Sequence, residues 1–187
     1  LWMTRGEYLL CRVLVADTGR PTPIAGDRFY RGAGFLPDDM THYHEMFGMF
    51  GKYVSHIPES YHRLQAGDCL QVGSNQWQVL IGRGPSPEHA CLFCAELNLL
   101  ISGDQLLPTI SSNVSVYPTE PGANPLGDWL TSLQRLKESI PSDVLVRPAH
   151  GRPFRGAHER LDDMIAEHNE GLDKLQDLCR EPKRAID

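Results

Sequence analysis

The chain has 187 residues, of which 41% are hydrophobic, enough for the buried core of one domain. Its 24 acidic residues outnumber its 18 basic ones, the formal charge is -6, and the basic residues are dispersed, which excludes the clustered positive face that nucleic acid requires. No stretch approaches the roughly 18 consecutive apolar residues that span a bilayer, and the opening residues lack the layout of a signal peptide. We therefore expect a cytoplasmic protein that binds neither nucleic acid nor membrane.

The cysteines number five, an odd count at uneven spacing that is typical of reduced thiols rather than of a disulfide framework. Cys91 and Cys94 have the C-x-x-C spacing of redox and zinc sites. They lie, however, inside an apolar run that predicts a strand, and no second pair completes a zinc site. We interpret them as core residues, with a redox or metal role as the alternative.

Helices are expected in the first third of the chain. Residues 7–17 contain good helix formers and are followed by Gly19-Arg-Pro-Thr-Pro, which ends the helix. A second, amphipathic helix is expected to start at Pro37 and to continue through Phe50, because its apolar residues recur every three or four positions. We expect residues 1–60 to form a helical lid or insertion.

The pattern then changes to short runs that are typical of strands. Residues 62–82 predict a β-hairpin, with turn residues at Gly73-Ser74-Asn75. Residues 90–94 and 99–102 are two apolar runs that predict a pair of buried strands.

The last third alternates helix and strand. A helix is expected from Pro125 to Ile140, a short buried strand over residues 144–146, and a long amphipathic helix over residues 161–178. This order predicts an α/β or α+β fold in which helices cover a sheet. Residues 61–187 would form that part of the molecule.

Residues suited to catalysis or metal binding cluster at three strand ends. They lie in Gly84-Pro85-Ser86-Pro87-Glu88-His89, in Ser102-Gly103-Asp104 and in Pro148-Ala149-His150-Gly151. Glycines in each segment allow sharp turns, and short loops on a rigid sheet are where hydrolytic metal sites are commonly built.

The order and spacing of these segments resemble the metallo-β-lactamase superfamily, which has G-H-S/T-x-x-H before a strand, S/T-G-D after the next strands and x-x-H-G near the end. Four segments are similar to a bacterial branch of the superfamily that is related to glyoxalase II: SPEHACLF, LISGDQLLP, ISSNVSVYPTEP and RPAHGRPFRG. The resemblance covers the chain from about Gly82 to the last helix. It implies the C-terminal half of an αββα sandwich.

The resemblance also implies roles for individual residues. Asp104 matches the carboxylate that bridges two metals, and His150 matches the terminal histidine of the second metal site. His89 matches a supporting residue. Pro85 stands where the family has a ligand histidine, and proline offers no donor atom. Zinc, iron and manganese all suit a carboxylate and an imidazole, so the metal stays open.

The H-x-H-x-D-H segment that supplies the other ligands in the family is absent from this chain. His42-Tyr-His44-Glu lacks the following Asp-His, and in a helix His42 and His44 would point about 200° apart. In the family the missing segment belongs to the first half of the fold, so we expect this chain to lack it by truncation.

The expected function is therefore that of a metal-dependent hydrolase of a small ester, thioester or lactam, which acts through metal-activated water and is inactive in this chain as it stands. The alternative is a degenerate scaffold of the same fold that only binds or self-associates. Because half of a layered fold exposes a sheet edge and an apolar face, a homodimer is a further expectation.

Overall fold

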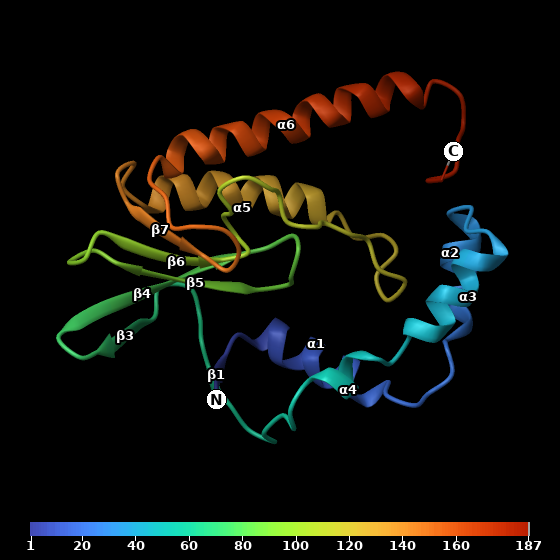
Figure 1. The fold of residues 1–187 in the computed structure, drawn as a ribbon, viewed down its shortest axis with the longest axis horizontal. Helices are drawn as coiled ribbons and strands as arrows, with labels where there is room; N and C mark the ends of the chain where they lie inside the picture. Colours follow the sequence, from blue (N-terminus) through green and yellow to red (C-terminus); the bar gives the residue numbers. More distant parts are fainter. Residues whose placement is uncertain (187) are drawn as a thin grey trace.

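The main sheet of the molecule has five strands in the order β3-β4-β5-β6-β7 (Figure 1). The computed structural model describes residues 1–186. Strands β3 to β6 are antiparallel, whereas β7 is parallel to β6. The strands are β3 (Cys69–Val72), β4 (Asn75–Gly82), β5 (His89–Cys94), β6 (Leu99–Gly103) and β7 (Leu145–Pro148). The predicted hairpin, buried strand pair and final strand are confirmed.

Two helices, α5 (Pro125–Ser139) and α6 (Ala157–Leu178), cover one face of this sheet (Figure 1). Helix α5 begins where predicted, because Pro125 occupies its first turn and the side chain of Asn124 accepts a hydrogen bond from Gly127 N at 3.0 Å. The mixed α/β class is confirmed. The sheet and these helices form one β layer with its α layer.

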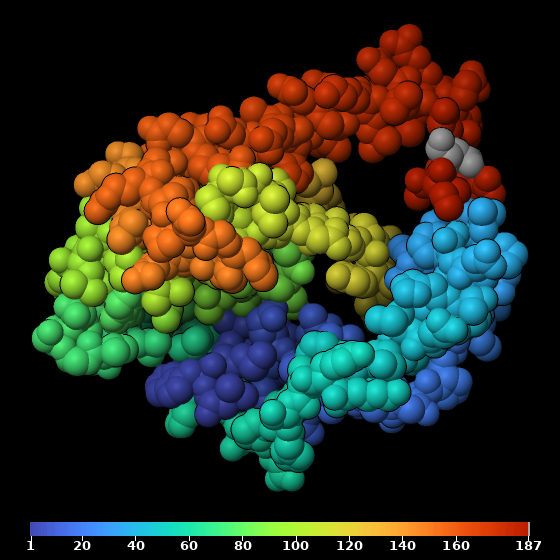
Figure 2. All heavy atoms as spheres, viewed as in Figure 1, coloured from blue at the N-terminus to red at the C-terminus, as the bar shows by residue number. Residues whose placement is uncertain are grey.

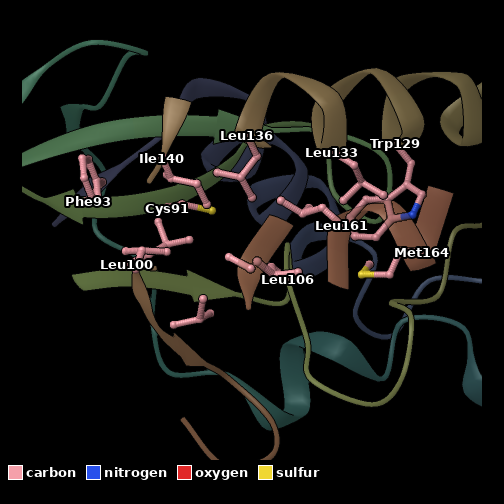
Figure 3. Close-up of a cluster of buried hydrophobic side chains, with 13 residues drawn as sticks. Cys91, Phe93, Leu100, Leu106, Trp129, Leu133, Leu136, Ile140, Leu161 and Met164 are labelled. Atoms are coloured by element: carbon pink, nitrogen blue, oxygen red, sulfur yellow. The ribbon is translucent and has the colours of Figure 1, made fainter. Parts of the chain in front are cut away.

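The core lies between the two helices and the sheet. Figure 3 shows side chains from α5 and α6 meeting there, among them the fully buried Trp129, Leu133, Leu161 and Met164. Each fully buried side chain of this kind stabilises the fold by about 1.5–3 kcal/mol relative to exposure. The apolar stripes predicted for both helices are therefore their buried faces.

The N-terminal segment contains the helices α1 (Arg5–Ala16), α2 (Ile24–Gly32), α3 (Pro37–Met46) and α4 (Phe50–Tyr53). Helix α1 confirms the first predicted helix. The prediction of one continuous helix from Pro37 to Phe50 was wrong, because the helix breaks at Gly48, where φ is +68°. A Cβ at that glycine would lie 2.4 Å from the Asp17 carbonyl oxygen, so the close approach of these two segments requires the break.

Helix α2 was not predicted. Its sequence is short and polar, and tertiary packing against α3 stabilises it. A Cβ at Gly26 would lie 2.0 Å from the Tyr43 hydroxyl, so this glycine lets α3 pack directly on the α2 backbone. The rings of Tyr30 and Tyr43 also pack, with centroids 4.5 Å apart.

The N-terminal residues are attached to the loop that joins β4 to β5. The Thr4 hydroxyl donates to the Glu88 carbonyl oxygen at 2.7 Å, and Gly6 N donates to the Glu88 carboxylate at 2.8 Å. Strand β1 (Trp2–Met3) pairs in parallel with β2 (His62–Arg63). Figure 2 shows the start of the chain, in dark blue, lying against the green sheet region. Within residues 1–186, no helix combines the length and the apolar character needed to cross a bilayer.

Candidate functional site

Asp104 and His150 are brought together by the parallel pairing of β6 and β7. Their register aligns Leu100 with Val146 and Gly103 with Pro148, so the carboxyl ends of both strands lie at the same edge of the sheet. The Ala149 N–H donates to the Gly103 carbonyl oxygen at 3.0 Å and ties the two following loops together. Residues far apart in the sequence therefore become neighbours.

The two side chains face each other. His150 Nε2 lies 3.5 Å from Asp104 Oδ1, and the side chains are 69% and 47% exposed. Although half of the Asp104 side chain is exposed, its Oδ1 atom is shielded from water and has no hydrogen-bond partner in residues 1–186. A shielded carboxylate oxygen beside an imidazole nitrogen is the arrangement that a shared cation would satisfy. A largely exposed contact of this kind contributes little to the stability of the fold.

Hydrogen bonds from serines fix the backbone around Asp104. The Ser102 hydroxyl donates to the Leu106 carbonyl oxygen at 2.8 Å. The Ser112 hydroxyl donates to the carbonyl oxygen of Asp104 itself. The carboxylate is thus carried by a loop whose conformation is fixed at both ends.

His89 lies directly against the residue that precedes Asp104. Its partner across the antiparallel sheet is Gly82, at the end of β4. Gly103 has a φ of +54°, and a Cβ there would lie 2.2 Å from His89 Nε2. The positive φ favours glycine at position 103, and the absence of a side chain there makes room for the His89 ring.

Pro85 lies in the loop that joins β4 to β5. The neighbouring Gly84 has a φ of +119°, and a Cβ there would lie 2.6 Å from the Cβ of Trp129, so the loop is pressed onto helix α5. Next to Pro85, the Ser86 hydroxyl is buried and has no hydrogen-bond partner in residues 1–186.

The sequence matches the family model of the metallo-beta-lactamase superfamily over residues 15–151. This chain belongs to the metallo-beta-lactamase superfamily.

Two solved structures of the superfamily resemble it closely. A beta-lactamase domain protein from Burkholderia ambifaria is 36% identical with a TM-score of 0.81, over 96% of this chain and 49% of that one. A metallo-beta-lactamase family protein from Thermus thermophilus has a TM-score of 0.74 at 24% identity, over 98% of this chain and 57% of that one, and shows the fold alone.

A curated relative, an uncharacterized protein from Aquifex aeolicus (strain VF5), is 30% identical over 108 residues, which are 57% of this chain and 49% of that protein. The chain thus spans about half the length of the relatives that it matches.

Proteins of this superfamily generally bind divalent metals, and the residues here fit such a site only in part. Asp104 and His150 have suitable donor atoms and face one another. A zinc site needs three or four protein ligands, whereas residues 1–186 contain no group of three or more His, Cys, Asp or Glu side chains that could hold an ion. The described residues therefore offer two candidate donor side chains, fewer than a zinc site needs.

The other candidate ligands have different partners. His44 Nε2 lies 2.9 Å from Asp27 Oδ1, and His42 is exposed elsewhere on α3. Cys91 and Cys94 are free and buried. The Cys91 thiol donates to the Ser102 carbonyl oxygen at 3.3 Å, and burial raises its pKa to about 12, so it remains a thiol.

The contacts that assemble the site were not predicted from the sequence. The bond from Ala149 to Gly103 and the bond from Ser112 to Asp104 join loops that are distant in sequence. Backbone donors carry no sequence signature, so the bond that Ala149 makes to Gly103 could not be predicted. The serines of the segment from Ser111 to Asn113 were the only available indication of the second bond.

Proposed function

We propose that this chain provides Asp104 and His150 as two ligands of the metal centre of a hydrolase. The observation that carries the proposal is the 3.5 Å approach of His150 Nε2 to Asp104 Oδ1, an oxygen that is shielded from water and accepts no hydrogen bond within residues 1–186. Superfamily membership supports it. The remaining ligands come from outside the described residues, since two side chains alone hold a divalent ion weakly.

A bound zinc, iron or manganese ion would supply Lewis acidity that lowers the pKa of a water to about 7. The chain's own residues position the ligands: Ser112 holds the Asp104 backbone, and His89 supports Gly103. The substrates would be small esters, thioesters or lactams.

Residues 1–60 would form one wall or lid of the substrate site. Support comes from the contacts of Thr4 and Gly6 with Glu88, because they connect this helical segment to the loop that carries Pro85. The substrate-contacting residues of the opposite wall would lie in the segment 113–125.

By itself the chain would be inactive. The test joins it to the segment of the Burkholderia ambifaria protein that it does not cover, about half of that chain. Purified chain and fusion protein are incubated with zinc, iron and manganese and dialysed, and bound metal is measured by elemental analysis together with ester and thioester hydrolysis. The fusion should retain metal and hydrolyse substrate, whereas the chain alone should do neither.

Two pairs of variants control this experiment. Asp104→Asn and His150→Gln should lower both metal content and hydrolysis in the fusion. Asp173→Asn and His42→Gln change exposed residues of the same types and should leave both unchanged. A folded fusion that binds metal equally well with and without Asp104 contradicts the proposal.

A second candidate function is a degenerate scaffold that binds ligands or a second copy without catalysis. Pro85 favours it, because a ring without donor atoms stands at a ligand position. If Pro85→His restores metal binding and hydrolysis to an otherwise inactive fusion, loss of that ligand has inactivated the site. If it changes neither, the degenerate scaffold is favoured.

Self-association of the chain would use its exposed apolar side chains. Leu9 and Val13 on α1 are 54% and 51% exposed, and Ile101 on β6 is 41% exposed. Light scattering should then give twice the 21.0 kDa mass of the chain. A monomer at high concentration excludes this part of the proposal.

A further inference from the structure

A cavity of about 320 Å³ lies along the β4 edge of the sheet, at its border with α5. Strand β3 pairs with β4 only as far as Cys69 and Gln78, so the last part of β4 is not covered by its neighbour. In the strand order, β4 lies next to one edge of the sheet and β7 forms the opposite edge (Figure 1). None of Asp104, His150, His89 and Pro85 lines the cavity.

Three arginines line this cavity: Arg63, Arg83 and Arg135. None of their guanidinium groups makes a hydrogen bond or an ion pair within residues 1–186, although acidic residues outnumber basic ones 24 to 18 in the chain. Glu88 is the acidic residue of the lining, and its carboxylate accepts a hydrogen bond from Gly6 N. Three positive charges and one negative charge leave a net charge of about +2, which attracts an anion.

Polar groups continue from the arginines into the interior. A second cavity of about 200 Å³ adjoins the first, with Ser132 and Arg135 in the lining of both. The Ser132 hydroxyl accepts a hydrogen bond from Arg83 N at 2.8 Å, so its own hydrogen is available to a ligand.

Gln105 lines the inner cavity and is only 1% exposed. Neither its amide oxygen nor its amide nitrogen has a hydrogen-bond partner in residues 1–186. A Cβ at Gly82 would lie 2.1 Å from Gln105 Cδ, so this glycine admits the amide group. A buried amide without partners is unfavourable unless a ligand or water satisfies it.

We propose that this cavity binds a small molecule through its phosphate group. The three guanidinium groups offer paired N–H donors that match phosphate oxygens, and the net charge matches a phosphate dianion. The Ser132 hydroxyl and the Gln105 amide would bind polar groups of the same ligand deeper in the cavity. The site is separate from the proposed metal centre, and neither proposal depends on the other.

The test titrates inorganic phosphate into the full chain at constant ionic strength and follows the arginine and glutamine side-chain N–H signals by NMR. Saturable shifts at the phosphate-binding side chains of Arg83 and Arg135 are expected. Arg135→Gln and Arg83→Gln should each weaken binding by about 10- to 100-fold, the effect of losing a charge-assisted hydrogen bond. Both arginines are exposed, so the fold should tolerate the changes.

Arg20→Gln removes an exposed arginine outside the cavity and should leave the affinity unchanged. Asp104→Asn should also leave it unchanged, which separates this site from the metal site. Shifts without saturation, or equal losses in Arg20→Gln and Arg135→Gln, overturn the proposal. If acetate binds as tightly as phosphate, the assignment to phosphate is wrong.

Discussion

Gly103→Ala tests the packing that positions Asp104. Alanine at a φ of +54° costs about 1–2 kcal/mol in backbone strain. Its Cβ would also lie 2.2 Å from His89 Nε2, and such overpacking costs about 1–3 kcal/mol more. The free energy of unfolding, measured by urea denaturation, should therefore fall by about 2–5 kcal/mol.

Gly73→Ala is the matched control for backbone strain. Gly73 has a φ of +61°, and a Cβ there would have nothing within 4 Å, so only the strain of about 1–2 kcal/mol should be lost. In a His89→Ala background the cost of Gly103→Ala should fall to the same value, because the overlap is gone. Equal costs for Gly103→Ala and Gly73→Ala in the wild-type background would refute the reasoning.

Leu133→Ala changes a fully buried core residue and should lower the free energy of unfolding by about 2–5 kcal/mol. Leu175→Ala changes a residue that is 54% exposed and should alter that free energy by less than about 0.5 kcal/mol. Similar losses for both variants in urea denaturation would contradict the assigned core. The thiol of Cys91 has a pKa raised to about 12 by burial, against about 8.5 when unfolded, so its contribution to stability is complete below pH 8.5 and is lost as the pH rises toward 12, by up to about 1.4 kcal/mol per pH unit. The difference in stability between the wild type and Cys91→Ala should follow that slope, and a flat difference would show that the thiol is not buried as described.

Much of the fold could be predicted because local sequence patterns agree with the tertiary structure. Pro125 and the stripe containing Trp129 and Leu133 specify α5, and the alternation around Gly73 specifies the hairpin. Helix α2 and the break at Gly48 could not be predicted. Both depend on close contacts with residues distant in sequence, and a glycine alone does not reveal which backbone will approach it.

The candidate site was predictable in its members but not in its geometry. The motifs that contain Asp104 and His150 are local, and their position at strand ends follows from the strand pattern. The two side chains meet because β6 and β7 pair in parallel. Helix α5 lies between these strands in the sequence, so their pairing could not be predicted from local patterns. The three arginines of the β4 cavity belong to no sequence motif, since they come from three separate parts of the chain. Arg63 ends β2, Arg83 directly follows β4, and Arg135 lies within α5.

Manganese titration of the full chain, followed by NMR, tests most directly whether Asp104 and His150 belong to one cation site. Paramagnetic Mn²⁺ detects weak sites because it broadens the amide signals nearest to it. Broadening should begin at Asp104, His150 and Ala149, should be lost in Asp104→Asn and should persist in Asp173→Asn. Broadening that begins at other acidic residues, or that is unchanged in Asp104→Asn, would contradict the claim.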